Sequence, residues 1–389
     1  MLDTLARRLV LPVNAKAEVV RPRRNNGRRP SVSVIIPCYN YGRYLTQCVN
    51  SVLDQQGVRL EVIVIDDASS DGSDQIVRQL GARDTRIRTI CHTANQGHIA
   101  TYNEGISQVS GDYTVLLSAD DLLTPGCLGR ATSLMEEYLS VGLAYGFPVE
   151  FTDGDLPAAH TTAKSWIIWQ GHDWLARRCK AGGNALKSPE AVIRTSVLRE
   201  VGGYQVGLPH AADFALWMRA ATVSDIGYVA GADQAYYRNH ASNMHHSTFD
   251  MRDDFSERLA SFDTVFSECS GLLEHPDSMR DTAHRALARN ALNHAIRDTA
   301  HRALARSSLS HAIRPHLRGT VGDEPVGDYA AFALKAWADA KHLGEWRTLD
   351  KLSNVCDGPP RFGPLLITHM VVSKLRSRSS EWRWRWTGI

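Results

Sequence analysis

Two pairs of adjacent aspartates, Asp66-Asp67 and Asp120-Asp121, could bind a cation, because each closely follows a short run of apolar, β-branched residues. Such runs predict strands buried on both faces of a parallel sheet, and ligands bind at the edge where parallel strands end. Four carboxylates gathered there would be neutralised, paired or metal-bound, and their oxygens suit Mg²⁺ or Mn²⁺ bridging a diphosphate. Helix capping is the alternative, since Asp67 and Asp71 lie in an ASSDGS turn.

The elements that would position these carboxylates alternate between strand and helix. Apolar runs predict strands at 31–37, 60–66, 87–91 and 113–117. Helical spacing predicts helices at 44–55, 74–81 and 98–110. This alternation is typical of an α/β fold with a doubly wound, mostly parallel sheet. The segments that follow three of the strands should therefore converge on one site: 37–40, 66–67 and 118–121.

Charge is unevenly distributed along the 389 residues. The net charge is +2, but residues 1–30 carry +6, residues 361–389 carry +5, and the body between them carries −9. An acidic body is a poor electrostatic partner for DNA or RNA, which excludes a nucleic-acid-binding role. The seven cysteines are scattered without CxxC spacing, which favours reduced thiols and a cytoplasmic protein. No apolar run is long enough for a transmembrane helix.

The chain after Phe249 is rich in Ala, Arg and Leu and predicts a helical region over 247–389. It contains two tandem copies of a 17-residue unit, 280–296 and 297–313. Seventeen residues make about 4.7 helical turns, so copies on one continuous helix would face different ways, and a helical hairpin is the alternative. Two copies are too few for a repeat array, which favours a duplication without a binding role.

Four motifs give the chain a resemblance to the inverting family-2 glycosyltransferases of GT-A fold. In order they are SVSVIIPCYNYGRYLTQCVNSVLDQ, VIVIDDASSDGS, NQGHIATYNEGISQVSGDYTVLLSADDLL, and GGYQVGLPHAADFALWMR with YYRNHASN. The resemblance covers residues 31–246, about 55% of the chain. It implies a GT-A domain with a nucleotide-binding half at 31–121, an acceptor half at 122–246 and a helical C-terminal extension. Residues 1–30 would be a basic segment or linker.

The resemblance also implies the residues that bind the donor. Pro37, Tyr39 and Asp67 match residues that cradle the donor base, with Tyr39 able to stack on it and Asp67 able to accept a hydrogen bond. Four further donor contacts are implied at Asn95, Gly97, Ser118 and Asp120.

Metal ligands and a general base follow from the same resemblance. Asp120 matches the metal-binding second acid of the DxD motif, whose first acid is replaced by Ser118, so that Asp121 gains importance. His240 matches a histidine that completes the metal and diphosphate site. Asp213 falls where the family places its general base, although the preceding acid is replaced by Ala212. From the pattern alone, Asp213 could also be the N-cap of a helix over 214–221.

We therefore expect a hexosyltransferase dependent on Mn²⁺ or Mg²⁺ that moves a sugar from a nucleotide sugar to a hydroxyl group with inversion. The acceptor would be a glycan or a lipid-linked molecule of cell-envelope polysaccharide or glycolipid synthesis. Ser118 and Ala212 leave open a non-catalytic sugar-nucleotide-binding protein of the same fold. A nucleotidyltransferase shares the acidic strand ends, but PCYNYGRY after the first strand is not the Gly-rich, basic loop that this class usually has.

The two basic ends suggest a location for such an enzyme. Trp382, Trp384 and Trp386 alternate with Arg383 and Arg385, and Trp and Arg together favour the lipid interface. Basic clusters near an anionic inner leaflet contribute about 1 kcal/mol per residue. The sequence therefore predicts peripheral membrane contact through the termini, with two solvated tails as the alternative.

Overall fold

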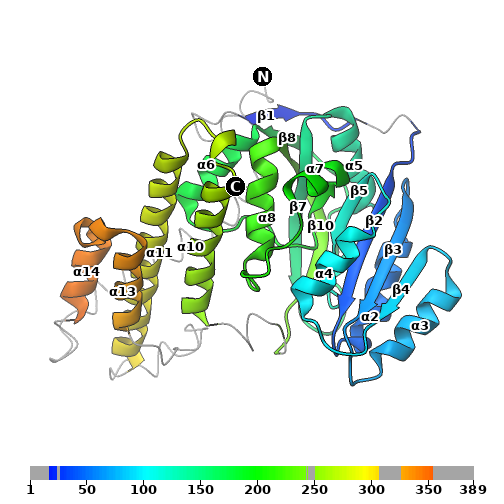
Figure 1. Ribbon diagram of the computed structural model, residues 1–389, viewed down its shortest axis with the longest axis horizontal. Coiled ribbons are helices and arrows are strands. Elements are labelled where there is room, and N and C mark those ends of the chain that lie inside the picture. The colour runs from blue at the N-terminus through cyan, green and yellow to red at the C-terminus, as the bar shows by residue number, and fades with distance from the viewer. Residues whose placement is uncertain (1–16, 24–26, 242, 244–249, 306–325, 354–389) are drawn as a thin grey trace.

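The computed structural model describes residues 17–23, 27–241, 243, 250–305 and 326–353. Within these residues, ten strands form one mixed sheet that is covered by helices on both faces (Figure 1). Nine strands lie in the order β1-β8-β10-β7-β9-β5-β2-β3-β4, and the short β6 pairs with β10 beside this path. The predicted α/β fold is confirmed.

The strands between residues 31 and 116 form a parallel part of the sheet, in the order β5-β2-β3-β4. Its strands are β2 (Ser31–Cys38), β3 (Arg59–Asp66), β4 (Ile87–Cys91) and β5 (Tyr113–Leu116). Cys38 lies opposite Asp66 in the register, and the Asp67 N–H donates to the Cys38 carbonyl at 2.8 Å. The ends of β2 and β3 therefore meet at one edge, as predicted.

The second part of the sheet combines one long parallel pair with antiparallel pairs. Its strands are β6 (Leu122–Leu123), β7 (Val141–Phe151), β8 (Ser165–Trp169), β9 (Val192–Arg194) and β10 (Asp225–Arg238). Residues 1–30, expected to be a basic segment or linker, include β1 (Ala17–Val20), which pairs antiparallel with β8. Pairing satisfies backbone groups of β8 that an uncovered edge would expose.

Neighbouring residues of β2 face opposite layers, because side chains alternate along a strand. Ile35 belongs to one buried apolar cluster, whereas Val34 and Ile36 belong to the other. Three helices pack on the Val34 side: α2 (Gly42–Leu53), α3 (Ser73–Arg83) and α5 (Cys127–Glu137). Four pack on the Ile35 side: α4 (His98–Ser107), α6 (Gly171–Ala181), α7 (Thr195–Val201) and α8 (Ala212–Val223).

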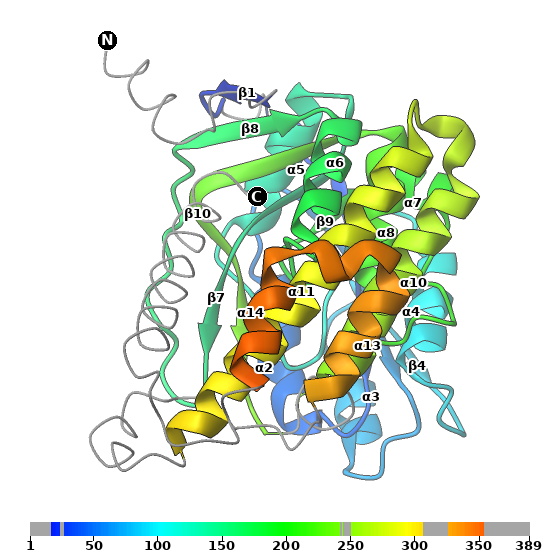
Figure 2. The same ribbon diagram turned by 90° about the vertical axis from the view of Figure 1, so that its left-hand side faces the viewer.

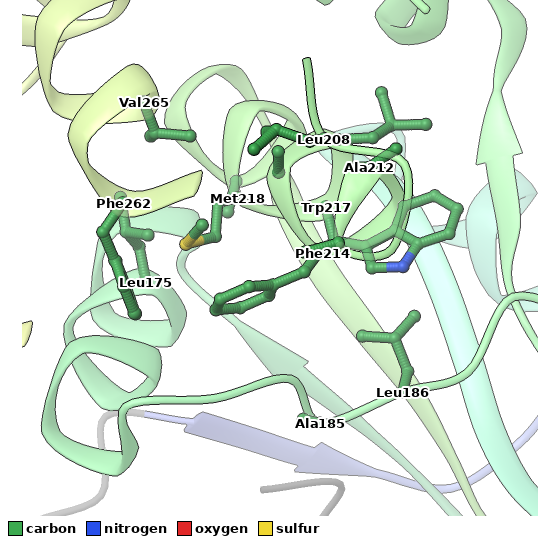
Figure 3. Close-up of a cluster of buried hydrophobic side chains, with 14 of the residues drawn as sticks. Leu175, Ala185, Leu186, Leu208, Ala212, Phe214, Trp217, Met218, Phe262 and Val265 are labelled. Carbon is green, nitrogen blue, oxygen red and sulfur yellow. The ribbon is translucent and has the colours of Figure 1, made fainter. Parts of the chain in front are cut away.

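The C-terminal part is helical, as predicted, and lies beside α6 and α8 (Figures 1 and 2). Its elements are α10 (Met251–Glu268), η1 (Ser270–Leu272), α11 (Pro276–Ala305), α13 (Val326–Ala336), η3 (Ala338–His342) and α14 (Gly344–Ser353). Asp250 is the N-cap of α10 and forms a capping box with Asp253. Phe262 of α10 is fully buried with its ring 5.2 Å from that of Phe214 in α8 (Figure 3). The C-terminal helices thus share a core with the sheet domain.

The first tandem copy and the start of the second lie on one continuous helix, α11. Equivalent positions have different surroundings: Thr299 is buried, whereas Thr282 is only partly buried. This agrees with the expectation that a 17-residue period turns the two copies to different sides. The remainder of the second copy, the first 16 residues and the Trp/Arg tail lie outside the described residues. None of the described helices combines the length and apolarity that crossing a membrane requires.

Candidate active site

A cavity of about 1160 Å³ opens between the sheet domain and the first C-terminal helix. One part of its wall comes from the segments after β2 and β5, through Tyr41, Ser118, Asp120 and Asp121. Another part comes from the start of α8, including Asp213, and from α10. The cavity therefore brings together the predicted metal-binding acids and the predicted base, although far-apart segments carry them.

Asp120 and His240 form the most direct contact among the predicted metal ligands. His240 Nε2 lies 3.0 Å from Asp120 Oδ2, and both side chains are almost fully buried. The imidazole ring lies between Tyr41 and Tyr44, with ring centroids at 5.5 and 5.1 Å. Its Nδ1 is buried without a hydrogen-bond partner among the described residues. The ring is held in place by packing while one nitrogen remains unused.

Asp121 is buried beside Asp120 and is held by the last residue of β10, two positions before His240. Its Oδ1 accepts a hydrogen bond from the Arg238 N–H at 2.9 Å. Burial, together with the neighbouring charge of Asp120, raises the pKa of Asp121 well above the ordinary value. The Arg238 guanidinium binds the Asp120 carbonyl at 2.8 Å and Gln47 at 2.7 Å. It thereby fixes the backbone that presents both aspartates.

The chemistry of this group of residues fits a hard divalent cation. No cluster of three or more metal-ligating side chains is found within the described residues. Mg²⁺, however, is usually bound through one or two carboxylates together with substrate phosphates and water. Asp120 and Asp121 supply carboxylates at the cavity wall, and a cation would relieve the repulsion between them. Asp120, Asp121 and His240 are therefore suitable residues to hold Mn²⁺ or Mg²⁺ beside a diphosphate.

Asp67 lies in a tight network after β3. Its carboxylate oxygens accept hydrogen bonds from the amides of Gln96 and Gly97 at 2.8 and 2.9 Å, and His92 Nδ1 lies 2.7 Å from Oδ1. Burial alone would raise the pKa of Asp67, but these hydrogen bonds outweigh it and lower the pKa. Asp67 therefore ties the loop before α4 to β3. The capping alternative is wrong for both aspartates of this turn, because the N-cap of α3 is Gly72. Asp71, the residue before this cap, accepts hydrogen bonds from the Ser73 and Gly42 amides.

Four other predicted donor-binding residues are not among the described residues that line the cavity: Pro37, Tyr39, Asn95 and Gly97. Tyr39 is 51% exposed, and Pro37 is the next-to-last residue of β2. Asn95 donates to the Asp67 carbonyl at 3.3 Å, and Gly97 has a φ of +85° at the start of α4. Such a φ suits glycine. The assignments of Pro37, Tyr39 and Asp67 to the donor base, and of Asn95 and Gly97 to donor binding, therefore stay predictions.

Asp213 lies in the first turn of α8, which begins one residue earlier, at Ala212, after the cap residue Ala211. The N-cap alternative for Asp213 is therefore wrong. Its Oδ2 lies 3.4 Å from both Asn184 Nδ2 and Ser188 Oγ. Burial raises its pKa to about 6, against the opposing effects of the Phe214 amide and His210. A carboxylate with this pKa can take a proton near neutral pH.

His210, three residues before Asp213, is tied to the first C-terminal helix. Its Nε2 lies 3.1 Å from Asp254 Oδ1, and Glu257 accepts hydrogen bonds from the amides of His210 and Ala211. Burial would lower the pKa of His210, but Asp254 and Glu257 raise it. Helix α10 thus holds the segment that leads into Asp213.

Sequence reasoning missed three buried ionisable residues of this region. His92 bridges Asp67 and Glu104, with His92 Nε2 2.6 Å from Glu104 Oε2. Glu190 is 1% exposed, and its Oε2 has no hydrogen-bond partner among the described residues. Arg178 is 5% exposed and lines the cavity. No motif marks these residues, because their significance comes from burial and contacts rather than from spacing.

Solved structures define the class of this fold. TarS of S. aureus in complex with UDP-GlcNAc is 18% identical, with a TM-score of 0.53 over 91% of each chain. A mannosyltransferase from Pyrobaculum calidifontis in complex with GDP-Man and Mn²⁺ is 16% identical, with a TM-score of 0.52 over 96% of this chain and 92% of the other. These likenesses show a GT-A fold.

Residues 33–201 match the family described as glycosyl transferase family 2. An uncharacterized glycosyltransferase of Haemophilus influenzae is 28% identical over 55% of this chain and 67% of its own length. Glycosyltransferase AglE of Haloferax volcanii is 31% identical over 51% of this chain and 63% of its own length. The chain spans from about a third to two thirds of the first curated relatives that it matches.

Proposed function

We propose that this protein is a metal-dependent inverting glycosyltransferase that moves a hexosyl group from a nucleotide sugar to a hydroxyl group. The observation that carries the proposal is one cavity lined by Asp120, Asp121 and Asp213. The first two are placed to hold a cation and the diphosphate, while the third has the pKa of a base. The Mn²⁺ and nucleotide sugars bound by proteins of the same fold support the first of these assignments.

The residues divide the chemistry between them. Asp213 takes the proton of the acceptor hydroxyl as its oxygen attacks the anomeric carbon on the face opposite the diphosphate. Ser188 and Asn184 hold the carboxylate from one side. A divalent cation held by Asp120, Asp121 and His240 would stabilise negative charge on the departing diphosphate. Because the reaction inverts the anomeric centre in one displacement, a single base suffices.

A panel of UDP- and GDP-sugars tests this proposal, with Mn²⁺ or Mg²⁺ and release of the nucleoside diphosphate as the readout. Asp213→Asn should lower transfer by about 10²–10⁴-fold and leave donor affinity nearly unchanged, because a base acts in the transition state. Glu200→Gln is the matched control, since Glu200 is an exposed carboxylate on α7. It should keep full transfer.

The same measurements separate the two alternatives. A donor that binds without any turnover, with or without acceptors, would support the non-catalytic sugar-nucleotide-binding protein. Release of pyrophosphate from a nucleoside triphosphate and a sugar phosphate would support a nucleotidyltransferase. Failure to bind any nucleotide sugar in the presence of Mn²⁺ or Mg²⁺ would contradict the proposed function altogether.

We further propose that the acceptor is a glycan or lipid-linked molecule of the cell envelope, and that the enzyme works on the inner face of the membrane. The support is the +6 charge of residues 1–30, the +5 charge of residues 361–389 and the alternation of Trp and Arg over 382–386. A lipid-linked acceptor stays in the bilayer, so docking of the enzyme raises the local concentration of both partners.

A further inference from the structure

Arg178 is a buried cation at the wall of the cavity. It lies in the last turn of α6, is 5% exposed and lines the cavity with Ala181 and Asn184. Its Nε has no hydrogen-bond partner among the described residues. The guanidinium carbon lies 5.4 Å from the centre of the Trp174 ring, one helical turn earlier. The charged group is therefore packed against an aromatic ring, on a residue that lines a space that a ligand could fill.

No carboxylate neutralises this charge within the described part of the chain. The other Lys and Arg residues of the described cavity wall each have an ion pair: Lys187 with Glu150 at 2.6 Å, and Arg258 with Asp254 at 2.5 Å. Burial lowers the pKa of Arg178, yet an arginine stays protonated in proteins. A buried charge without a partner costs several kcal/mol, and an apolar residue at this position would avoid that cost.

Arg178 precedes the chain segment that contacts the proposed base, Asp213, rather than the segment that carries Asp120 and Asp121. The chain continues from α6 through Asn184, whose Nδ2 lies 3.4 Å from Asp213 Oδ2, to Ser188, whose Oγ lies at the same distance from that oxygen. Arg178 therefore lies on the element that leads into the surroundings of the base. The proposed function places the donor diphosphate at Asp120 and Asp121, so the group that approaches Asp213 belongs to the acceptor.

We propose that Arg178 forms an anion-binding subsite for the acceptor, which carries a phosphate or carboxylate group near the hydroxyl that is glycosylated. This inference rests on the proposed function. The guanidinium presents several N–H donors in a planar fork that matches the oxygens of phosphate or carboxylate. An anion bound there would neutralise the buried charge and orient the attacking hydroxyl toward Asp213.

Direct binding of inorganic phosphate to the full chain, measured by calorimetry with saturating donor nucleotide, tests the subsite without requiring turnover. Arg178→Met keeps the length of the side chain and removes its charge. Lys180→Met is the matched control, because it removes an exposed cation from the same helix. We expect Arg178→Met to weaken phosphate binding at least tenfold, whereas Lys180→Met leaves it unchanged. Equal binding by the wild-type protein and Arg178→Met would overturn the inference.

Thermal unfolding of the same variants distinguishes a binding role from a structural one. If Arg178 is kept for a ligand, Arg178→Met should unfold at the same or a higher temperature than the wild-type protein. A large decrease would show instead that Arg178 stabilises the fold, which would overturn the inference. Arg178→Lys, which keeps the charge, should retain part of the phosphate binding.

Kinetics then show which substrate carries the anion. With a donor from the panel, Arg178→Met should raise the KM for phosphorylated or carboxylated acceptors and leave neutral acceptors and slow donor hydrolysis unchanged. An increase in the KM for donor hydrolysis would assign Arg178 to the donor and overturn the acceptor subsite. If the wild-type protein uses no donor at all, the proposed function fails, while phosphate binding still decides whether the subsite exists.

Discussion

His240 and Asp120 are 120 positions apart in the sequence, yet His240 Nε2 lies 3.0 Å from Asp120 Oδ2. The contact joins the segment after β10 to the segment after β5, with the two side chains 6% and 7% exposed. In the free protein the imidazole therefore lies within hydrogen-bonding distance of one of the paired carboxylates. A bound cation and diphosphate would use the same side chains.

Replacing His240 tests its assignment to the cation. His240→Ala should raise the Mn²⁺ concentration needed for half-maximal donor hydrolysis by roughly tenfold or more, since groups that hold or orient a metal typically change its affinity by such factors. The maximal rate at saturating Mn²⁺ should fall less. His342→Ala, which removes an exposed histidine of η3, should change neither quantity. An unchanged Mn²⁺ dependence in His240→Ala would remove His240 from the metal site.

The pKa of Asp213 predicts a pH profile for transfer. Because burial raises this pKa to about 6, the carboxylate is deprotonated above this pH and can act as base. The value of kcat/KM should therefore rise about tenfold per pH unit below pH 6 and level off above it. The residual rate of Asp213→Asn should lack this step. A step that persists in Asp213→Asn belongs to another group and would argue against the assignment.

The parallel part of the sheet was predictable because its strands are continuous apolar runs separated by helices of regular spacing. The proximity of Asp120 and His240 was predictable for a different reason: both lie in motifs that resemble those of a known family. Strand β1 was missed because four residues with one charge, AEVV, carry no usable pattern. Their pairing with β8 is a tertiary contact.

The wall of the cavity formed by α6 and α10 was least predictable. Helix α10 carries Asp254 and Arg258 into the cavity wall, but nothing in its amphipathic pattern indicates the surface against which it packs. Similarly, an arginine in a helix is ordinarily solvated, and only the packing of α6 shows that Arg178 is buried. The spacing of apolar residues predicts helices and strands and their buried faces. The partners of a buried charged residue depend instead on how these elements pack in the folded chain.

Glu190 predicts a pH-dependent effect on stability. Burial raises its pKa to about 8, compared with about 4.3 in an unfolded chain. Because the folded state holds the proton of Glu190 more tightly than the unfolded chain does, this group favours folding at low pH. The stability that it contributes is lost as the pH rises from about 4.3, the pKa in the unfolded chain, to about 8, the pKa in the folded protein. Glu190→Gln should therefore become more stable relative to the wild-type protein from pH 5 to pH 8, by at most about 1.4 kcal/mol per pH unit. Denaturant unfolding at both pH values measures this, and a constant difference would contradict it.

Membrane attachment predicts that the protein floats with vesicles. The full chain should co-float with anionic phosphatidylglycerol vesicles at low salt and less at high salt, because ions screen the attraction of its basic ends. A chain ending at Arg361 lacks the Trp and Arg residues of 382–386 and should float less. Neutral phosphatidylcholine vesicles are the control. Equal recovery of the two chains, or binding that ignores salt and lipid charge, would contradict attachment through the C-terminal tail.

The shared core of the sheet domain and the C-terminal helices predicts that they unfold together. Phe262 of α10 is fully buried against Phe214 of α8, as Figure 3 shows. Phe262→Ala should lower the free energy of unfolding by about 3–5 kcal/mol, because it leaves a cavity between the two helices. Leu272→Ala, at a residue that is 52% exposed, should change it by less than about 0.5 kcal/mol. Fluorescence and circular dichroism should report one common transition for Phe262→Ala, whereas an early transition confined to helical signal would mean that the C-terminal helices unfold independently.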